Sequence, residues 1–317
     1  MRDRLITVLG GSGFIGRHLV RRLAAQGHRI RIGVRRPEKA RFLQPLGDVG
    51  QVVPIQVNVR DDTSVLAAIN GAWGVVNLVG VLHSGGPQTF AALHAQGAGR
   101  VAHLARLGGV SRLIQVSAIG AARGSGSRYA QTKAEGEEAA LAEFPAATVV
   151  RPSLVFGPED QFFNRFAALA ALSPVLPVFG ETIAEAGLTR FQPVYVGDVA
   201  AAIVLCLAED GAAGKIYELG GPKVYTYRQL MALVLAYTGR RRLLVPVPFG
   251  VAHVGAAILE LLPGAPLTRD QVRLLRQDSI CGALPGLAQL GIEPTPVEAV
   301  VPRFLSRFRK GGRVVEV

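Results

Sequence analysis

The chain has 317 residues, of which 49% are hydrophobic and 18% are charged, and its net charge is +12 at neutral pH. This composition excludes an intrinsically disordered chain and predicts a buried core large enough for two domains. The positive charge favours anionic partners such as a phosphorylated cofactor, an acidic protein or an anionic membrane surface. The competing interpretation is that the arginine content simply follows the base composition of the genome.

The cysteines and the apolar runs bear on where the protein works. Cys206 and Cys281 form no C-x-x-C pattern and have no histidine pair at metal-ligand spacing, so we expect no metal site and a reducing, cytoplasmic setting. The apolar run Leu5 to Leu9 is short, and prolines and polar residues interrupt the most apolar later segment, Leu243 to Leu262. We therefore expect neither a secretory signal nor a transmembrane helix.

Short β-branched runs alternate with helical patterns through the first half of the chain. Strands are predicted at residues 5–9, 30–34, 52–57, 75–79, 113–116 and 148–150, and helices at about 13–26, 64–70, 90–107 and 127–143. This alternation implies right-handed crossovers and a parallel sheet that helices cover on both faces. The predicted class is α/β, with a doubly wound parallel sheet.

Prolines and glycines interrupt this rhythm after Arg151-Pro152. We assign residues 1–155 to the sheet domain and expect residues 189–210 or so to return to it, with a strand and a helix at about 191–207. The remainder, residues 156–188 and 211–317, is predicted to form a smaller C-terminal α/β lobe for a substrate or partner.

A glycine motif directly follows the first strand and opens the first helix: Gly10-Gly11-Ser12-Gly13-Phe14-Ile15-Gly16. In this G-x-x-G-x-x-G pattern, Gly10 permits a sharp turn, Gly13 lets the backbone approach a pyrophosphate, and Gly16 lets the helix pack closely. Free amides at the helix N-terminus then face the phosphates. The motif and its context predict a Rossmann domain that binds a dinucleotide.

The end of the second strand indicates which dinucleotide binds. Sites for NAD place an Asp or Glu there, which accepts hydrogen bonds from the ribose 2′-hydroxyl. This chain has Arg35 and Arg36 instead, and no acid before Glu38. Two guanidinium groups suit a 2′-phosphate, and Arg17 is placed to join them. We therefore predict NADP(H) in preference to NAD(H); the competing interpretation is that both arginines are merely solvated.

Three polar residues predict a proton-transfer site. Ser117 ends a strand and comes twelve residues before Tyr129, and Lys133 follows the tyrosine by four positions. Residues i and i+4 share a helix face, so Tyr129 and Lys133 point the same way. The lysine is expected to lower the phenol pKa and to hold the nicotinamide ribose, while Tyr129 exchanges a proton with a carbonyl oxygen.

These motifs together identify a resemblance along the whole chain. The sequence resembles the extended short-chain dehydrogenases of the NAD-dependent epimerase/dehydratase superfamily, and most closely the atypical branch with the nucleotide-binding accessory subunit of respiratory complex I and its bacterial relatives. The blocks that carry it, besides the glycine motif and the Tyr129–Lys133 pair, are Phe42-Leu43-Gln44-Pro45-Leu46-Gly47, Val76-Asn77-Leu78-Val79-Gly80, Val116-Ser117-Ala118-Ile119-Gly120, Arg151-Pro152-Ser153-Leu154-Val155-Phe156-Gly157-Pro158 and Gln192-Pro193-Val194-Tyr195-Val196-Gly197-Asp198-Val199.

The resemblance implies further cofactor contacts. It places Pro152 and Ser153 beside the nicotinamide, and Asn58 and Val59 beside the adenine. It also assigns these residues to the dinucleotide: Phe14, Ile15, Leu78, Val79 and Gly80.

One departure from the superfamily concerns the substrate. Nucleotide-sugar enzymes of this class often carry an Asn in an N-V-x-G-T helix, where this chain reads His94-Ala95-Gln96-Gly97-Ala98. The change argues against epimerase or dehydratase chemistry. Two interpretations of His94 stay open: a substitute polar group at the site, or an ordinary helix residue.

Three functions remain as alternatives. The resemblance implies a dinucleotide-binding accessory or assembly component of a membrane complex such as complex I. The retained Ser117, Tyr129 and Lys133 instead favour an active NADPH-dependent oxidoreductase on a carbonyl or quinone-related substrate. A nucleotide-sugar epimerase or dehydratase ranks last, and no nucleic-acid partner is expected.

The last third of the chain leaves the location open. An apolar segment runs from about Phe249 to Leu262, and the chain ends with the basic residues Arg303, Arg307, Arg309, Lys310 and Arg313 among aromatic and aliphatic ones. Such a tail suits peripheral binding to the cytoplasmic face of the inner membrane. The competing interpretation is that the apolar helix packs in the second lobe and the tail caps it.

Overall fold

The computed structural model describes residues 3–82, 84–262 and 267–311, and the chain divides into two compact units. The sheet unit comprises Met1–Pro152, Val196–Leu219 and Ala283–Glu293. The second unit comprises Ser153–Tyr195, Gly220–Gly282 and Pro294–Val317. This partition places residues 211–219 and 283–293 in the sheet unit, although the sequence assigned them to the smaller lobe.

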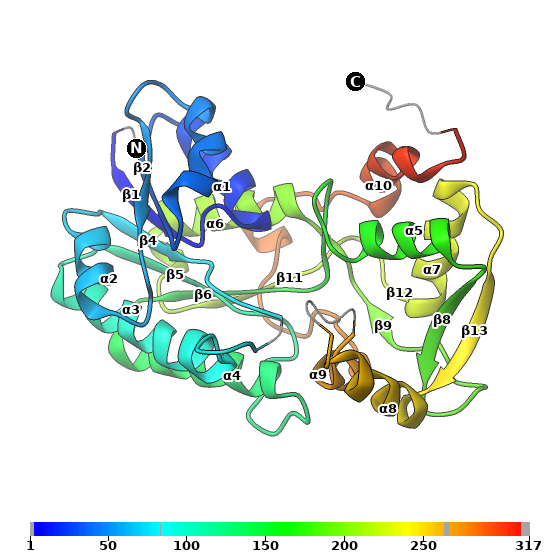
Figure 1. The fold of residues 1–317 in the computed structure, drawn as a ribbon. Coiled ribbons are helices and arrows are strands. Elements are labelled where there is room, and N and C mark those ends of the chain that lie inside the picture. The colour runs from blue at the N-terminus through cyan, green and yellow to red at the C-terminus, as the bar shows by residue number, and fades with distance from the viewer. Residues whose placement is uncertain (1–2, 83, 263–266, 312–317) are drawn as a thin grey trace. The chain divides into compact units, whose positions relative to one another are not determined.

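Seven parallel strands form the central sheet of the first unit (Figure 1). They are β1 (Leu5–Leu9), β2 (Arg29–Val34), β3 (Val52–Gln56), β4 (Gly74–Asn77), β5 (Arg112–Val116), β6 (Thr148–Pro152) and β11 (Ile216–Leu219), in the order β11-β6-β5-β4-β1-β2-β3. The apolar side chains of the inner strands are mostly buried, as expected of strands covered on both faces, whereas the edge strand β3 leaves Val53 exposed. Because the strand order reverses between β1 and β4, the loops that follow these two strands border the crevice where such sheets bind ligands.

Helices cover both faces of this sheet, as the sequence predicts (Figure 1). On one face α1 (Phe14–Ala25) packs against α6 (Val196–Ala208), and on the other α3 (Gln96–Leu107) packs against α2 (Asp62–Ile69) and α4 (Arg128–Glu143). Further helical segments, which are not α-helical, are η1 (Pro37–Leu46), η2 (Ala91–Ala95), η3 (Asp210–Ala212) and η4 (Ala288–Leu290). The predicted helix at 90–107 therefore begins with a π-helical turn, η2.

The expectation of a returning strand and helix at about 191–207 is half wrong. The helix is α6, but the short strands before it, β9 (Arg190–Phe191) and β10 (Val194–Tyr195), stay in the second unit. There β9 pairs with β12 (Tyr225–Thr226) and β10 pairs with β7 (Val155–Phe156). The seventh place in the sheet goes to β11, whose four residues pair in parallel with β6.

The second unit is built around its own apolar core. Its longest strand pair joins β8 (Val175–Gly180) to β13 (Leu243–Pro248). Its helices are α5 (Phe163–Leu172), α7 (Tyr227–Thr238), α8 (Phe249–Leu259), α9 (Arg269–Leu274), α10 (Val297–Leu305) and the turn η5 (Ser306–Phe308). The core gathers aromatic and aliphatic side chains from most of these elements, including Phe163, Tyr227, Phe249 and Leu305. No helix among the residues that the structure describes is long and apolar enough to cross a bilayer.

The C-terminal segment packs onto its own unit. Leu305 is buried, and Phe304 and Phe308 lie against the core. Arg309 Nε donates to the Tyr237 carbonyl at 2.9 Å, and Arg307 hydrogen-bonds Asn164. The apolar residues of the tail therefore cap the core, as the competing interpretation expects. Arg313 lies outside the described residues.

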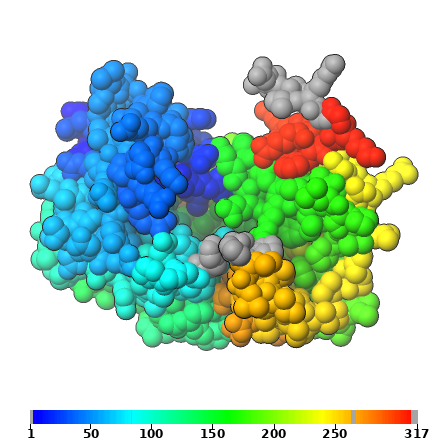
Figure 2. Space-filling view, viewed as in Figure 1, coloured from blue at the N-terminus to red at the C-terminus, as the bar shows by residue number. Residues whose placement is uncertain are grey.

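Helix α8 divides its apolar surface between the core and solvent. Phe249, Ala252 and Ala256 are buried. Val254 and Ile258 point the other way and are each 64% exposed. Figure 2 shows α8 and α9, in orange, at the surface of the second unit. The exposed side of α8 is continued by Leu261 and Leu262.

Candidate functional site

The glycine loop connects β1 to α1 as the motif predicts. Gly10 has φ of 78°, a left-handed conformation that glycine adopts without strain. A Cβ atom at Gly10 would lie 3.3 Å from the backbone of Leu78 and Val79, in the loop after β4. A Cβ at Gly16 would lie 2.5 Å from the Gly11 carbonyl oxygen. The motif thus brings two predicted cofactor segments together, and Gly16 makes room for the glycine loop itself.

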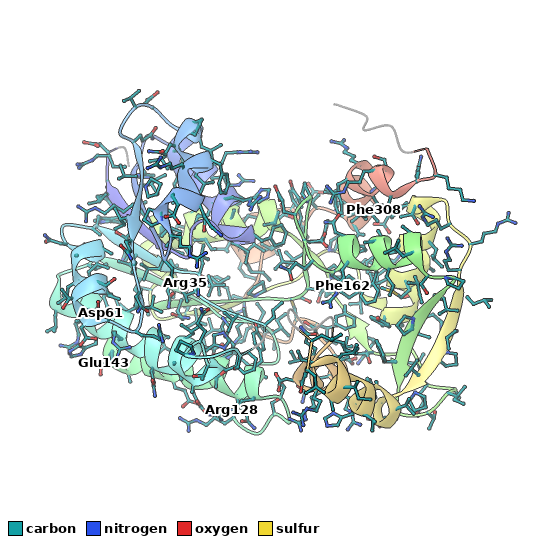
Figure 3. The ribbon with its side chains drawn as sticks, viewed as in Figure 1. Arg35, Asp61, Arg128, Glu143, Phe162 and Phe308 are labelled. Atoms are coloured by element: carbon teal, nitrogen blue, oxygen red, sulfur yellow. The ribbon has the colours of Figure 1, made fainter. Side chains whose placement is uncertain are left out.

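A pocket of about 490 Å³ lies beside the ends of β2 and β3. Arg35, which follows β2, lines it together with Asn58, Arg60, Asp61 and Ser64. Figure 3 labels Arg35 and Asp61 in this region. The pocket therefore brings together Arg35, which is predicted to bind the 2′-phosphate, and Asn58, which is predicted to contact the adenine.

Backbone contacts hold the adenine segment. The Asn58 amide donates to Ser64 Oγ at 2.7 Å, and the Asn58 Oδ1 accepts from the Arg60 amide at 3.2 Å. Val59 is buried, and its carbonyl accepts from Arg100 at 3.2 Å. These contacts fix the turn between β3 and α2.

The three arginines proposed for the 2′-phosphate differ in their surroundings. Arg35 and Arg36 are exposed directly after β2. The Arg17 guanidinium instead lies 5.3 Å from the ring centroid of Phe42, which belongs to η1. A cation stacked on an aromatic ring is held in place, so Arg17 ties α1 to η1.

Ser117, Tyr129 and Lys133 come from the end of β5 and the first turns of α4. The Lys133 ammonium donates to the Val116 carbonyl at 3.1 Å and lies 5.9 Å from the Tyr129 ring centroid. Ser117 is 4% exposed, and its Oγ has no hydrogen-bond partner within residues 3–82, 84–262 and 267–311. A buried hydroxyl without a partner is costly, so Ser117 is suited to a ligand atom.

The expected lowering of the tyrosine pKa is wrong for the protein without a ligand. Burial raises the pKa of Tyr129 to about 12. Burial also lowers the pKa of Lys133 to about 8, with partial opposition from the charge of Glu137. Desolvation disfavours the charged form of each group. A phenolate and an ammonium therefore do not both form readily at neutral pH.

Glu137 and Arg151 form a buried support below this pair. Arg151 donates to Glu137 through Nε at 2.9 Å and through Nη2 at 2.5 Å, and Glu218 of β11 lies 3.8 Å away. Arg151 precedes Pro152 on β6. The ion pair therefore fixes α4 to the strand that leads to the predicted nicotinamide contact at Pro152.

The last predicted contact, Ser153, is engaged inside the second unit. Its Oγ lies 2.6 Å from the Ser279 carbonyl and 3.1 Å from the Ser279 hydroxyl. Since Pro152 ends the first unit and Ser153 begins the second, the two residues belong to different units.

His94 is a polar residue of the site rather than an ordinary helix residue. It is 2% exposed in η2, and its Nε2 lies 3.0 Å from the Val81 amide. Its Nδ1 lies 3.2 Å from the Thr132 hydroxyl. The ring stacks on Phe90 and meets the Tyr129 ring edge to face at 5.3 Å. Burial, followed by the charge of Lys133, lowers the pKa of His94 to about 3.

Sequence reasoning missed two more residues that shape the loop after β4. Asn77 Nδ2 donates to Gln115 Oε1 at 2.9 Å, and Asn77 Oδ1 accepts from the Val79 amide at 3.1 Å. Both side chains are buried at the ends of adjacent strands. In the sequence, Asn77 and Gln115 stand out only as amide residues at or near the ends of largely apolar strands.

Comparisons with known proteins show what the chain and its fold are similar to. Residues 6–220 match the NAD dependent epimerase/dehydratase family. The chain is 37% identical to NADH dehydrogenase (ubiquinone) 1 alpha subcomplex subunit 9, mitochondrial, from Arabidopsis thaliana, over 96% of this chain and 78% of that protein. It is 31% identical to a ceramide reductase from Caulobacter vibrioides, over 80% of this chain and 77% of that protein. A dTDP-glucose 4,6-dehydratase from Streptomyces venezuelae, solved with NAD bound, has the same fold with a TM-score of 0.71, 21% identity and 96% coverage of each chain.

Proposed function

Because the chain belongs to the NAD dependent epimerase/dehydratase family, we propose that its sheet unit binds NADP(H) in preference to NAD(H) and that it serves as an accessory or assembly component of a membrane complex resembling complex I. The observation that carries the cofactor choice is the end of β2. Arg35 lines the pocket there, and Arg36 follows it. Guanidinium groups bind a phosphate through bidentate hydrogen bonds.

The remaining residues fit a dinucleotide. The free amides at the start of α1 suit the pyrophosphate, and the Asn58 segment suits the adenine. Lys133 and the partnerless Ser117 hydroxyl are suited to the nicotinamide ribose and to the oxygen of a second ligand. One acidic group, Asp61, also lines the pocket. Its charge opposes a phosphate, so the two arginines must outweigh it.

The accessory role is supported by the Arabidopsis relative, whose name makes it a subunit of NADH dehydrogenase. The similarity covers 96% of this chain, so it includes both units rather than the dinucleotide domain alone. His94 stands where nucleotide-sugar enzymes often carry an Asn, which argues against their chemistry.

The cofactor choice is tested by titrating NADPH and NADH into the double variant Arg35→Ser/Arg36→Ser by calorimetry. A hydrogen bond to a charged group contributes about 1.5–3 kcal/mol, so NADPH affinity should fall at least about tenfold. NADH affinity should stay unchanged, because NADH has no 2′-phosphate. An unchanged NADPH affinity in the variant would remove these arginines from the site.

A second candidate is an active NADPH-dependent oxidoreductase on a carbonyl or quinone-related substrate. The assembled Ser117, Tyr129 and Lys133 favour it, as does a reductase among the relatives. A bound dinucleotide supplies the hydride. Ser117 then donates a hydrogen bond to the carbonyl oxygen, Tyr129 donates the proton, and Lys133 orients the ribose.

This candidate predicts that Tyr129→Phe abolishes turnover and leaves NADPH affinity within about twofold, because the phenol is the proton donor. Single-turnover oxidation of bound NADPH, measured by fluorescence with a panel of quinones, aldehydes and ketones, checks it. Full activity of Tyr129→Phe on any substrate would show that Tyr129 is not the donor.

We also propose that the protein is cytoplasmic and binds peripherally to the cytoplasmic face of the inner membrane. Support comes from the exposed apolar side of α8 and from the net charge of +12. An exposed apolar helix side favours insertion into a membrane surface, and a net positive charge favours attraction to anionic lipids.

A further inference from the structure

His94 joins two segments that the dinucleotide must contact together. One is the loop after β4, residues 78–81, and the other is the turn of α4 that carries Tyr129 and Lys133. The Val81 amide lies on one side of the ring and the Thr132 hydroxyl lies on the other. The imidazole is therefore the bridge between the loop and the helix.

The hydrogen-bond network assigns the tautomer of the ring. The Val81 amide can only donate, so Nε2 must be the unprotonated nitrogen and Nδ1 carries the hydrogen. Nδ1 then donates to Thr132 Oγ1. The Thr132 hydroxyl in turn donates to the carbonyls of Arg128 and Tyr129, at 2.9 and 3.0 Å. Every polar group of this chain of bonds is satisfied.

Hydrogen bonds hold the loop at three of its amides, those of Leu78, Val79 and Val81. The Leu78 amide donates to the Leu9 carbonyl at 2.9 Å, and the Val79 amide donates to Asn77 Oδ1. His94 supplies the third anchor, at Val81. Without it, the partly buried Val81 amide would lose this hydrogen bond, and the last part of the loop would lose its anchor to the ring.

Gly80 shows how closely the parts meet. A Cβ atom at Gly80 would lie 3.3 Å from Lys133 Nζ and 3.6 Å from His94 Nε2. The backbone of Gly80 therefore lies close to both the ammonium and the imidazole. A shift of the loop would move Gly80 against the ammonium that is suited to the ribose.

The backbone that carries His94 is rigid on its other side. A Cβ atom at Gly136 would lie 2.0 Å from the His94 carbonyl oxygen, so α4 packs directly on this turn. The turn is π-helical, a local widening that often occurs at functional sites. Phe90 stacks on the ring with an interplanar angle of 25°. The ring therefore has a fixed position from which to hold the loop.

We infer that His94 is a positioning residue, which locks the loop after β4 to the Tyr129–Lys133 turn and thereby sets the affinity for the nicotinamide half of the dinucleotide. The inference rests on the proposed function. His94 does not touch the reacting atoms in this role. It acts through Val81 and Thr132, and its neutral form adds no charge beside Lys133.

The test uses the full chain and two ligands. NADPH spans both halves of the site, whereas 2′,5′-ADP occupies the adenosine half only. His94→Leu introduces an apolar side chain of similar bulk and removes the hydrogen bonds to Val81 and Thr132. We expect NADPH to bind at least about tenfold more weakly to His94→Leu, and 2′,5′-ADP to bind within about twofold of the parent protein.

A conservative variant provides the rescue. His94→Gln retains an acceptor for the Val81 amide and a donor for Thr132, so NADPH affinity should return to within about threefold of the parent. If His94→Leu does not fold, hydrogen exchange of the Val81 amide in the parent and in His94→Gln tests the role of the bridge instead. Protection in both proteins, increased by NADPH, supports the role.

Three results would overturn the inference. NADPH affinity in His94→Leu could equal that of the parent, which would make the bridge irrelevant to binding. Both ligands could weaken equally, which would assign His94 to general stability. The Val81 amide could exchange freely in the parent. Failure of the parent to bind either ligand is a different outcome, because it refutes the proposed function itself.

Discussion

Lys133 combines a favourable contact with an unfavourable environment. Its ammonium donates to a carbonyl, yet it is 7% exposed and burial lowers its pKa to about 8. Unfolded lysine keeps its proton to about pH 10.4. Below pH 8 the folded protein therefore carries a buried charge that the unfolded chain solvates freely. This penalty disappears as the pH rises from 8 towards 10.4, because the folded protein gives up the proton first.

Lys133→Met is therefore expected to stabilise the protein at pH 7, by about 1–3 kcal/mol after the loss of the hydrogen bond to Val116. The advantage should shrink between pH 8 and pH 10. Urea denaturation of both proteins at pH 7 and pH 10 measures it. A variant that is less stable at pH 7, or an advantage that does not change with pH, would show that Lys133 is not buried as a charge.

The elements around the site are held by close backbone contacts. Helix α4 touches the η2 turn through Gly136, whose hydrogen atoms face the His94 carbonyl. Helices α3 and α4 pack along their length. This approach sets the distance between η2 and the Tyr129–Lys133 turn, so a side chain at Gly136 must push the two elements apart.

Gly136→Ala should destabilise the protein by about 1–3 kcal/mol or more through this overpacking. The matched control is Gly255→Ala in α8, where an added Cβ meets no atom within 4 Å. That change should be neutral or stabilising by up to about 1 kcal/mol, because alanine is the better helix former. Thermal denaturation of both variants compares them. Equal effects at the two positions would contradict the close contact at Gly136.

Local pattern predicted most of the sheet unit but not its completion. The six predicted strands and the helix that follows the glycine motif are present within a few residues. The seventh strand, β11, has only four residues, and the glycines that flank it, Gly214 and Gly220, suit a loop equally well. Its pairing with β6 depends on contacts between residues far apart in sequence. The same limit explains why the roles of His94 and Asn77 needed the three-dimensional structure.

The basic residues of the C-terminal tail and the exposed apolar side chains lie on different elements of the second unit. In the tail, Arg309 donates to a carbonyl group of its own unit, and the apolar side chains pack on the core. The exposed apolar side chains belong to α8 instead. Removing the tail before Arg303 would therefore expose the core of the second unit, and substitutions on α8 test membrane binding more cleanly.

Val254→Glu/Ile258→Glu should reduce binding to phosphatidylglycerol vesicles at least about tenfold, since burying each apolar side chain contributes about 1.5–3 kcal/mol. Leu107→Glu is the control, at a side chain that is 62% exposed on α3. Co-sedimentation at low and high salt measures the bound fraction, and salt should weaken the parent's binding. Equal binding of parent and α8 variant would exclude this surface.

The proposed dinucleotide site is formed where the glycine loop, the loop after β4 and the Lys133 turn meet. The most direct measurement is the ratio of NADPH to NADH affinity of the unaltered protein, determined by calorimetry in the same buffer. We expect NADPH to bind at least about tenfold more tightly than NADH, since only its 2′-phosphate can pair with Arg35 and Arg36. Equal affinities, or tighter binding of NADH, would contradict it.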